Sequence, residues 1–235
     1  MPRSIADQTV EELGGPSSVL VRQRNDHVEL HRLLRELDGS TGTEQERVLR
    51  RIDRLVFSHA FAEETVLWPA IRRVLPDGDA LTLRIEEEHQ EVNQLVSELE
   101  TLGHDDPRRA PTLARLVQVL DEDVRDEEDV LFPRLQEALD ASALRRLGRQ
   151  WEVARRVSPT RPHPTVSRRP PGNAVSGLPL SLLDRSRDLV DAGVQHGPAS
   201  LAPVGRAVSR GLAAVAGWVE RVPLSRTGDR PPTSR

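Results

Sequence analysis

The chain contains an internal repeat of His and carboxylate residues, and this repeat restricts the folds that it can adopt. The first copy, residues 59–69, reads HAFAEETVLWP, and the second, residues 123–133, reads DVRDEEDVLFP. Each copy has a residue of a metal-ligand type, two Glu residues four and five positions later, and then two apolar residues and Pro. An acid–His pair precedes each copy, at 26–27 and 88–89. Matched His and carboxylate positions inside apolar helical segments predict a metal site built from four helices.

Apolar residues follow a helical period through most of the chain up to residue 157. They recur at three- and four-residue steps in four long segments separated by Gly- or Pro-containing turns: about 16–37, 43–75, 79–102 and 111–138. A shorter segment of the same kind covers about 142–157. Four long helices joined by short loops are typical of an up-down-up-down bundle. The sequence therefore predicts an all-α four-helix bundle over residues 16–157, with a short fifth helix at its end.

The composition excludes several classes of site. None of the 235 residues is Cys, so disulfides, zinc–thiolate sites and iron–sulfur clusters are excluded. Residues 1–13 contain no apolar run like that of a secretory signal, and the chain has no stretch of 18 or more apolar residues. We therefore expect a cytoplasmic protein.

Charge is divided unevenly along the chain. Residues 1–157 contain 32 acidic residues and 22 Arg, a net charge of −10, whereas residues 158–235 contain 5 acidic residues and 11 Arg, a net charge of +6. An acidic body binds nucleic acid poorly, so no nucleic-acid partner is expected. The basic end could contact an anionic surface or simply be solvated.

Residues of metal-ligand types interrupt the apolar face of every long helix. Side chains at i and i+4 share one helical face, about 6 Å apart, so the second and fourth helices can each point two ligands inward. The candidate metal ligands are His27, His59, Glu63, His89, Asp123 and Glu127. Buried carboxylates and imidazoles are costly unless they are paired or bound to metal. Imidazole and carboxylate donors together match the preferences of iron and manganese.

Each of these residues also has a plainer interpretation when taken alone. His27 could be a core histidine with satisfied hydrogen bonds, Glu63 or Glu127 a solvated helix residue, and the acidic run 121–129 an exposed face. Their coincidence on four helices, within a repeated frame, favours the metal site. His31 lies one turn after His27 and is expected outside the ligands or at the surface. The His residues not expected to be ligands are His104, His163 and His196.

The repeat resembles the hemerythrin-like family, whose HHE cation-binding domain has His and then His-x-x-x-Glu, given twice. The resemblance covers about residues 18–140. The first copy is complete, whereas the second has Asp123 where the family has His. Oxygen-carrying hemerythrins have a further His one turn after the His of the third helix, and here that residue is Asn93.

The resemblance implies a non-haem diiron centre with two iron ions, or with manganese in their place. It assigns His27 and His59 to one ion, His89 and Asp123 to the other, and Glu63 and Glu127 to bridges between them. A carboxylate in place of an imidazole makes the site harder and more anionic, which favours Fe(III) over Fe(II). That departs from reversible oxygen carriage and favours reaction with, or sensing of, O2, peroxide or NO.

Two other functions stay open at this point. One is an iron-handling or storage module without turnover, and the other is a helical scaffold whose C-terminal tail docks a partner or a membrane surface. The sequence does not decide whether the protein is an enzyme, and no residue is assigned as catalytic.

The C-terminal third of the chain has a different composition. Residues 158–180 are rich in Pro and Arg and predict a flexible linker. Residues 181–224 predict a weakly amphipathic helical tail with an apolar stripe, and residues 225–235 predict a disordered end. Because Gly residues interrupt the stripe, we expect the tail to order only against the bundle, a partner protein or an anionic membrane, and otherwise to be a dispensable disordered tail.

Overall fold

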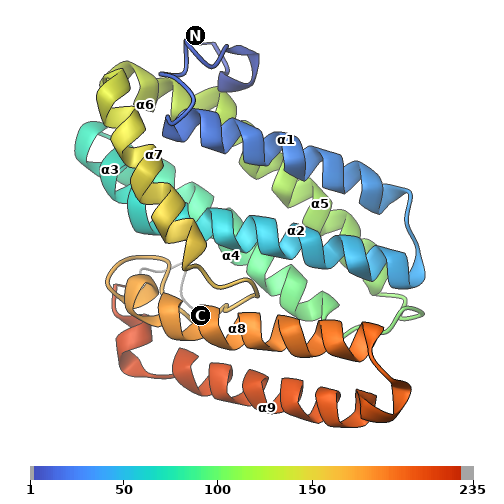
Figure 1. Cartoon of the computed structure of the whole chain (residues 1–235). Helices are drawn as coiled ribbons and strands as arrows, with labels where there is room; N and C mark the ends of the chain where they lie inside the picture. Colours follow the sequence, from blue (N-terminus) through green and yellow to red (C-terminus); the bar gives the residue numbers. More distant parts are fainter. Residues whose placement is uncertain (1–2, 229–235) are drawn as a thin grey trace.

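The computed structural model describes residues 3–228, and all of its regular elements in that part of the chain are helices, with no strand (Figure 1). The bundle helices are α1 (Val19–Asp38), α2 (Gly42–Ala62), α3 (Trp68–Val74), α4 (Gly78–Leu99), α5 (Arg109–Arg125), α6 (Phe132–Ala138) and α7 (Ala141–Arg156). Helices α2 and α3 run nearly end to end, as do α5 and α6, so that four long rods form the bundle (Figure 1). The predicted all-α fold is confirmed, and its helices begin and end within a few residues of the expected positions.

A π-helical turn joins the two helices of each double rod. The turns are η2 (Glu63–Leu67) and η3 (Asp126–Leu131), at matched places in the sequence repeat. Pro69 and Pro133 lie at the start of the following helices and have no N–H to donate to the carbonyl four residues back. The N–H groups of Trp68 and Phe132 instead donate to the carbonyls five residues back. The repeat therefore encodes a widened turn that begins at or next to each Glu pair.

The core is divided into two apolar clusters along the bundle. One contains the largest buried rings, Trp68, Phe132 and Trp151, together with Leu20 and Ile71. The other is aliphatic apart from Phe57 and includes Leu33, Ile52, Val92, Leu116 and Leu120. The candidate ligands belong to neither cluster and occupy the layer between them.

Two segments close the aromatic end of the bundle. The N-terminal segment contains η1 (Ile5–Asp7) and buries Ile5 and Leu13 completely. Helix α7 crosses α1 and α2, and a Cβ at Gly148 would overlap the backbone of Ser17 and Val19. Only Gly allows this close approach, which brings Trp151 of α7 into the core.

The C-terminal third forms a helical hairpin beside the bundle. It consists of α8 (Gly172–His196), η4 (Ala199–Leu201), α9 (Ala202–Glu220) and η5 (Pro223–Arg226). Helix α8 lies between α9 and the bundle (Figure 1). No helix in the described part of the chain has the length and apolar character that crossing a membrane requires.

The connection to this hairpin differs from the flexible linker expected at 158–180. Helix α8 already begins at Gly172, with Pro179 inside it, so only residues 157–171 are without helix. These residues pack on α4, where the amide of Gln90 donates to the carbonyl of Pro164 (3.0 Å) and Asn93 accepts from the backbone N–H of His163 (3.0 Å). Polar groups hold this segment, and a Pro- and Arg-rich composition does not reveal them. Of the expected disordered end, residues 225–228 complete η5 and the turn after it, and residues 229–235 lie outside the described residues.

Candidate metal centre

Four rods bring the six candidate ligands into one layer. His27 lies on α1, His59 and Glu63 lie at the junction of α2 and η2, His89 lies on α4, and Asp123 and Glu127 lie at the junction of α5 and η3. All six are buried, with exposed fractions from 0% for both Glu residues to 8% for His59 and Asp123. The sequence therefore identified a set of side chains that the fold does bring together.

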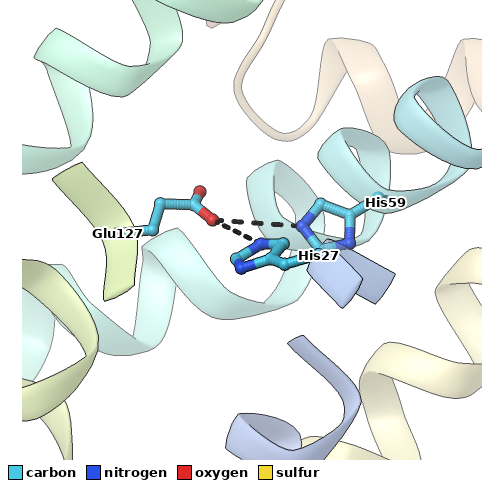
Figure 2. Close-up of side chains that lie close together, drawn as sticks. All are labelled: His27, His59 and Glu127. Carbon is cyan, nitrogen blue, oxygen red and sulfur yellow. Dashed lines mark ion pairs between the residues drawn. The ribbon is translucent and has the colours of Figure 1, made fainter. Parts of the chain in front are cut away.

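One group of donors consists of His27, His59 and Glu127 (Figure 2). The Nε2 atoms of His27 and His59 lie 3.1 Å and 4.0 Å from the same oxygen, Oε2 of Glu127. One donor atom from each residue lies within 4.8 Å of the other two, which is close enough for a single ion to contact all three.

A second group consists of Glu63, His89 and Glu127, again within 4.8 Å of one another. Nε2 of His89 lies 3.6 Å from Oε2 of Glu63 and 3.6 Å from Oδ1 of Asp123. The other oxygen of Glu63 lies 3.1 Å from Nε2 of His59. Glu63 and Glu127 therefore each face both groups, as bridging carboxylates would.

Each imidazole among the candidate ligands is held by a carboxylate at its outer nitrogen. The Nδ1 atoms of His27, His59 and His89 pair with Glu128 (2.8 Å), Asp26 (3.1 Å) and Glu64 (2.9 Å), respectively. A proton on Nδ1 leaves the lone pair on Nε2, which points into the layer. Carboxylates that orient histidines in this way are the usual outer partners of histidine metal ligands.

Aromatic rings fix the planes of the same imidazoles. Phe132 stacks on His27 (centroids 6.3 Å apart, 21°), and Trp68 stacks on His89 (6.2 Å, 21°). Trp151 meets the ring of His59 edge-on at 5.8 Å. Trp68 and Phe132 are the aromatic residues of the repeated Leu-aromatic-Pro frame, so the frame both widens the helix and covers the site.

Several carboxylate oxygens in the layer lack hydrogen-bond partners among residues 3–228. They are Oε2 of Glu63, Oδ1 of Asp123 and both side-chain oxygens of Glu127. Buried acceptors without partners are costly, and carboxylates cost more than neutral groups. A bound cation would satisfy these oxygens and the facing Nε2 lone pairs together, so the donor set fits a metal ion of the iron or manganese type.

The protonation equilibria reflect the same concentration of negative charge. Burial lowers the pKa of His27 and His89, but the neighbouring carboxylates outweigh burial and raise it to about 9 and about 10. Burial raises the pKa of Glu63 and Asp123, and the charge of Glu127 raises both further. Burial raises the pKa of Glu127, but the imidazoles of His27 and His59 that face it outweigh burial and lower its pKa to about 2. A field that favours protons on the imidazoles equally favours a metal cation in their place.

The second half of the repeat lacks one hydrogen bond between a carboxylate and an imidazole that the first half has. In the first half, Asp26 precedes His27 and accepts from His59. Glu88 holds the matching position before His89, but Asp123 offers no ring N–H. Within the described residues, Oε2 of Glu88 is buried without a hydrogen-bond partner, and burial and the charge of Asp126 raise the pKa of Glu88 to about 7.

Sequence reasoning missed the outer partners of the ligands. An α-helical wheel rotates Glu64 away from Glu63, yet in the π turn both are buried. Repetition of the Glu pair was the available signal for Glu64 and Glu128. Gln23, whose amide donates to Oε1 of Glu63 (2.8 Å), lies one turn before His27 and gave no signal of its own.

The remaining His residues and Asn93 have other roles. His31 lies at the surface, 3.8 Å from a carboxylate oxygen of Asp121, and the side chain of His104 is half exposed. His163 is buried between the linker segment and the hairpin, away from the layer. Asn93 anchors the linker segment at His163, and the side chain of His196 lies outside the described residues.

The linker segment reaches the His89 side of the layer. Nη1 of Arg168 lies 3.6 Å from Oε1 of Glu64, the oxygen that pairs with His89, and the amide of Asn173 donates to Oγ1 of Thr65 in η2 (3.3 Å). On the other side, the hydroxyl of Ser4 donates to the backbone carbonyl of Glu128 (3.3 Å). The C-terminal third therefore contacts one half of the site and the N-terminal segment the other.

A small cavity adjoins the layer. Its walls include the three ligand imidazoles, Asp123 and apolar side chains that include Leu30, Leu55, Val56 and Leu120. It has room for about one water-sized molecule. The cavity lies on the side of the layer where the three imidazoles and Asp123 meet apolar side chains.

Comparison with known proteins agrees with this geometry. The chain is 25% identical over 134 residues to an uncharacterized hemerythrin-like protein of Schizosaccharomyces pombe, which covers 57% of this chain and 66% of that protein. It is 25% identical over 133 residues to a DNA nickase of Nostoc, which covers 56% of this chain and 37% of the nickase. The similarity spans less than two thirds of either relative, and no solved structure matches the chain. The model of the hemerythrin HHE cation binding domain matches residues 18–135. That match takes in half of the chain and all six candidate ligands, and the chain belongs to the hemerythrin HHE cation-binding domain family.

Proposed function

We propose that the layer binds two iron ions, or manganese in their place, and that the loaded centre reacts with or senses O2, peroxide or NO. One observation carries the proposal: three Nε2 atoms and several unpartnered carboxylate oxygens face one another in a buried layer, while a carboxylate holds every outer ring nitrogen. A core without a cation would gain nothing from this arrangement.

The proposed ligand assignment takes five residues from the two donor groups and adds Asp123, which belongs to neither group but whose Oδ1 lies 3.6 Å from Nε2 of His89. His27 and His59 bind the first ion, His89 and Asp123 bind the second, and Glu63 and Glu127 bridge them. Bound metal supplies the redox chemistry. The chain's own residues orient the imidazoles, exclude water and hold protons on Nδ1.

Reaction with a small oxidant is favoured by the size and lining of the cavity. Its apolar walls suit O2, NO or peroxide more than a charged organic substrate. Asp123 in place of an imidazole adds negative charge, which stabilises the more oxidised metal and disfavours reversible oxygen carriage. Residues 1–157 have a net charge of −10, and this negative charge disfavours binding of the DNA on which a nickase, such as the Nostoc relative, acts.

Metal analysis tests the proposal directly. Purified protein loaded with Fe(II) without oxygen, then desalted, is expected to retain about two equivalents of iron. Near-ultraviolet absorption after exposure to oxygen, together with peroxide consumption, distinguishes a reactive centre from a storage module. Folded protein that retains almost no iron or manganese would disprove the metal site, whereas two equivalents without any reaction would leave only metal handling.

A further inference from the structure

The face of α9 that points away from the bundle is apolar. Val204, Val208, Val215 and Trp218 are exposed by 62%, 46%, 49% and 68%. These positions lie on one side of a helix, and the exposed residues between them on that side are Ala207, Gly211 and Ala214. Continuous apolar stripes on exposed helices mark contact surfaces.

The exposed charges next to this stripe are all positive. Arg210 is exposed on one flank of the stripe, and Arg221 follows on the same flank at the end of the helix, whereas Arg206 is exposed on the side of the helix opposite the stripe. The acidic residue of α9, Glu220, turns inward and accepts from Thr165 (2.7 Å) and pairs with Nδ1 of His163 (3.0 Å). Among the described side chains of α9, the outward face therefore carries apolar groups and positive charge without any acid.

Helix α8 also has its exposed apolar residues on one side and its acidic residues on the other. Its exposed apolar residues, at 47% to 76% exposure, lie on one side: Val175, Leu178, Leu182 and Leu189. Its acids face the other way, where Asp184 accepts from the backbone N–H of Thr160 (2.9 Å) and Asp188 and Asp191 pair with Arg161. Arg185 is the exposed charged residue on the apolar side of the described part of α8.

The hairpin is held in this orientation before any partner binds. The buried ring of His163 lies 3.1 Å from Asp184 of α8 and 3.0 Å from Glu220 of α9. Gly177 packs against Phe61 of the bundle, and Gly205 packs against Val194 across the hairpin. A partner would therefore not have to order the helices on binding.

We propose that the outer face of the α8–α9 hairpin docks on an anionic lipid bilayer surface without crossing it. Apolar helix faces bordered by Arg lie at the boundary between headgroups and acyl chains, and Trp is favoured at that depth. Residues 172–226, which form the hairpin, contain six Arg and four acidic residues, a net charge of +2, whereas residues 1–157 have a net charge of −10, so an anionic surface attracts the first and repels the second. This polarity orients the bundle away from the membrane.

The same charges disfavour two other occupants. A two-fold contact between copies would place the Arg residues of one α9 near those of the other, with no outward acid on the described part of the helix to pair with them. Nucleic acid would neutralise the Arg residues but would leave Val204, Val208, Val215 and Trp218 in water. An anionic bilayer offers acyl chains to the apolar stripe and negatively charged headgroups to the neighbouring Arg residues. This proposal does not depend on the metal site.

Vesicle binding by the full chain tests the proposal. We expect it to co-sediment with phosphatidylcholine vesicles that contain phosphatidylserine and to bind pure phosphatidylcholine vesicles roughly tenfold less, with binding weakened by salt. Of the three Trp residues, Trp68 and Trp151 are buried, so a blue shift of fluorescence on binding should come from Trp218 and disappear in Trp218→Phe.

Matched variants make the outcome decisive. Val215→Asp, on the stripe, and Arg210→Gln with Arg221→Gln, on its flank, should each reduce binding roughly tenfold or more. Val153→Asp, at a Val on α7 that is 62% exposed, should leave binding unchanged. The proposal is overturned if anionic vesicles do not bind, if Val215→Asp and Val153→Asp behave alike, or if the full chain instead forms a dimer that Val215→Asp dissociates. Binding to duplex DNA that matches binding to anionic vesicles would also overturn it.

Discussion

The two halves of the site share one frame but differ at a single ligand. In both halves a π turn begins at or beside a Glu pair, an aromatic ring stacks on an imidazole, and the second Glu of each pair holds the His of the other half. The α1–α2 half adds the pair between His59 and Asp26, whereas the α4–α5 half has Asp123 beside an unpartnered oxygen of Glu88. The frame is therefore set by backbone and packing, and the ligand at position 59 or 123 can vary within it.

This difference gives the two proposed metal positions different electrostatics. The first has two imidazoles and shared carboxylates, and the second replaces an imidazole by Asp123 with Glu88 nearby. Harder, more anionic sites stabilise higher oxidation states. We expect the two ions to differ in affinity and potential, and the variants below test that difference.

Glu127→Gln is expected to have the largest effect, because Glu127 belongs to both donor groups. Iron content should fall from about two equivalents to less than one, with both halves affected. Asp129→Asn, at an exposed acid of the same π turn, is the control and should retain full iron. Equal iron content in the two variants would remove Glu127 from the site.

Glu63→Ala should release more iron than Glu64→Ala, although both residues are buried. Glu63 faces Nε2 of His59 and His89, whereas Glu64 pairs with the outer nitrogen of His89 and with Arg168. Loss of an outer partner typically weakens metal affinity about 10- to 100-fold, so Glu64→Ala should weaken mainly the second position. Competition with a graded series of chelators measures both affinities, and a larger loss for Glu64→Ala would exclude Glu63 as a bridge.

Asp123→His should make the two halves alike. A ring N–H at position 123 would give Glu88 the partner that Asp26 has in His59, and a neutral ligand would stabilise Fe(II). The potential of the centre should rise by at least about 59 mV, a tenfold change in relative affinity for the two oxidation states. Adding Glu88→Gln should reverse part of the rise. An unchanged potential and iron content would show that Asp123 does not coordinate.

The sequence predicted the bundle and the six side chains because period and spacing carry that information directly. Apolar residues at three- and four-residue steps define the rods, and the i,i+4 relation places His59 with Glu63 and Asp123 with Glu127. The burial of Glu64 and Glu128 was not predicted, because it depends on a π turn, which an ideal helical wheel does not contain. The packing of the linker was not predicted either. Arg168 and the backbone of His163 form hydrogen bonds with polar side chains of α4, and such contacts leave no periodic pattern in the sequence.

The buried His163 predicts a pH dependence for the contact between the hairpin and the bundle. Burial lowers its pKa, but Asp184 and Glu220 outweigh burial and raise it to about 9. Since the folded pKa exceeds the ordinary value of about 6.5, the stabilisation is complete below pH 6.5 and is lost as pH rises through 9. The contribution of protonated His163 to the stability of this contact is at most about 3 kcal/mol.

Hydrogen exchange of α8 and α9 should therefore accelerate between pH 7 and 9.5, after correction for intrinsic rates, while the central part of α2 stays protected. His163→Gln should show fast exchange at both pH values. Exchange in the wild type that does not depend on pH would rule out His163 as the group that fastens the hairpin.

Arg168→Gln should have the smallest effect and should distinguish the halves most sharply. The Arg168 guanidinium lies 3.6 Å from the Glu64 oxygen that pairs with His89. Among the described residues, Glu128 pairs with His27 and with no Arg side chain. A nearby positive charge draws electron density from Glu64, so it weakens the pull of Glu64 on the His89 proton. Without the Arg168 charge, His89 becomes a stronger donor and should bind the second ion up to a few fold more tightly, with a lower potential at that position only.

Arg169→Gln, which removes an ion pair with Glu86 instead, is the neighbouring control. Equal shifts at both metal positions, or equal shifts in both variants, would mean that the linker affects the bundle generally and not the His89 half through Glu64.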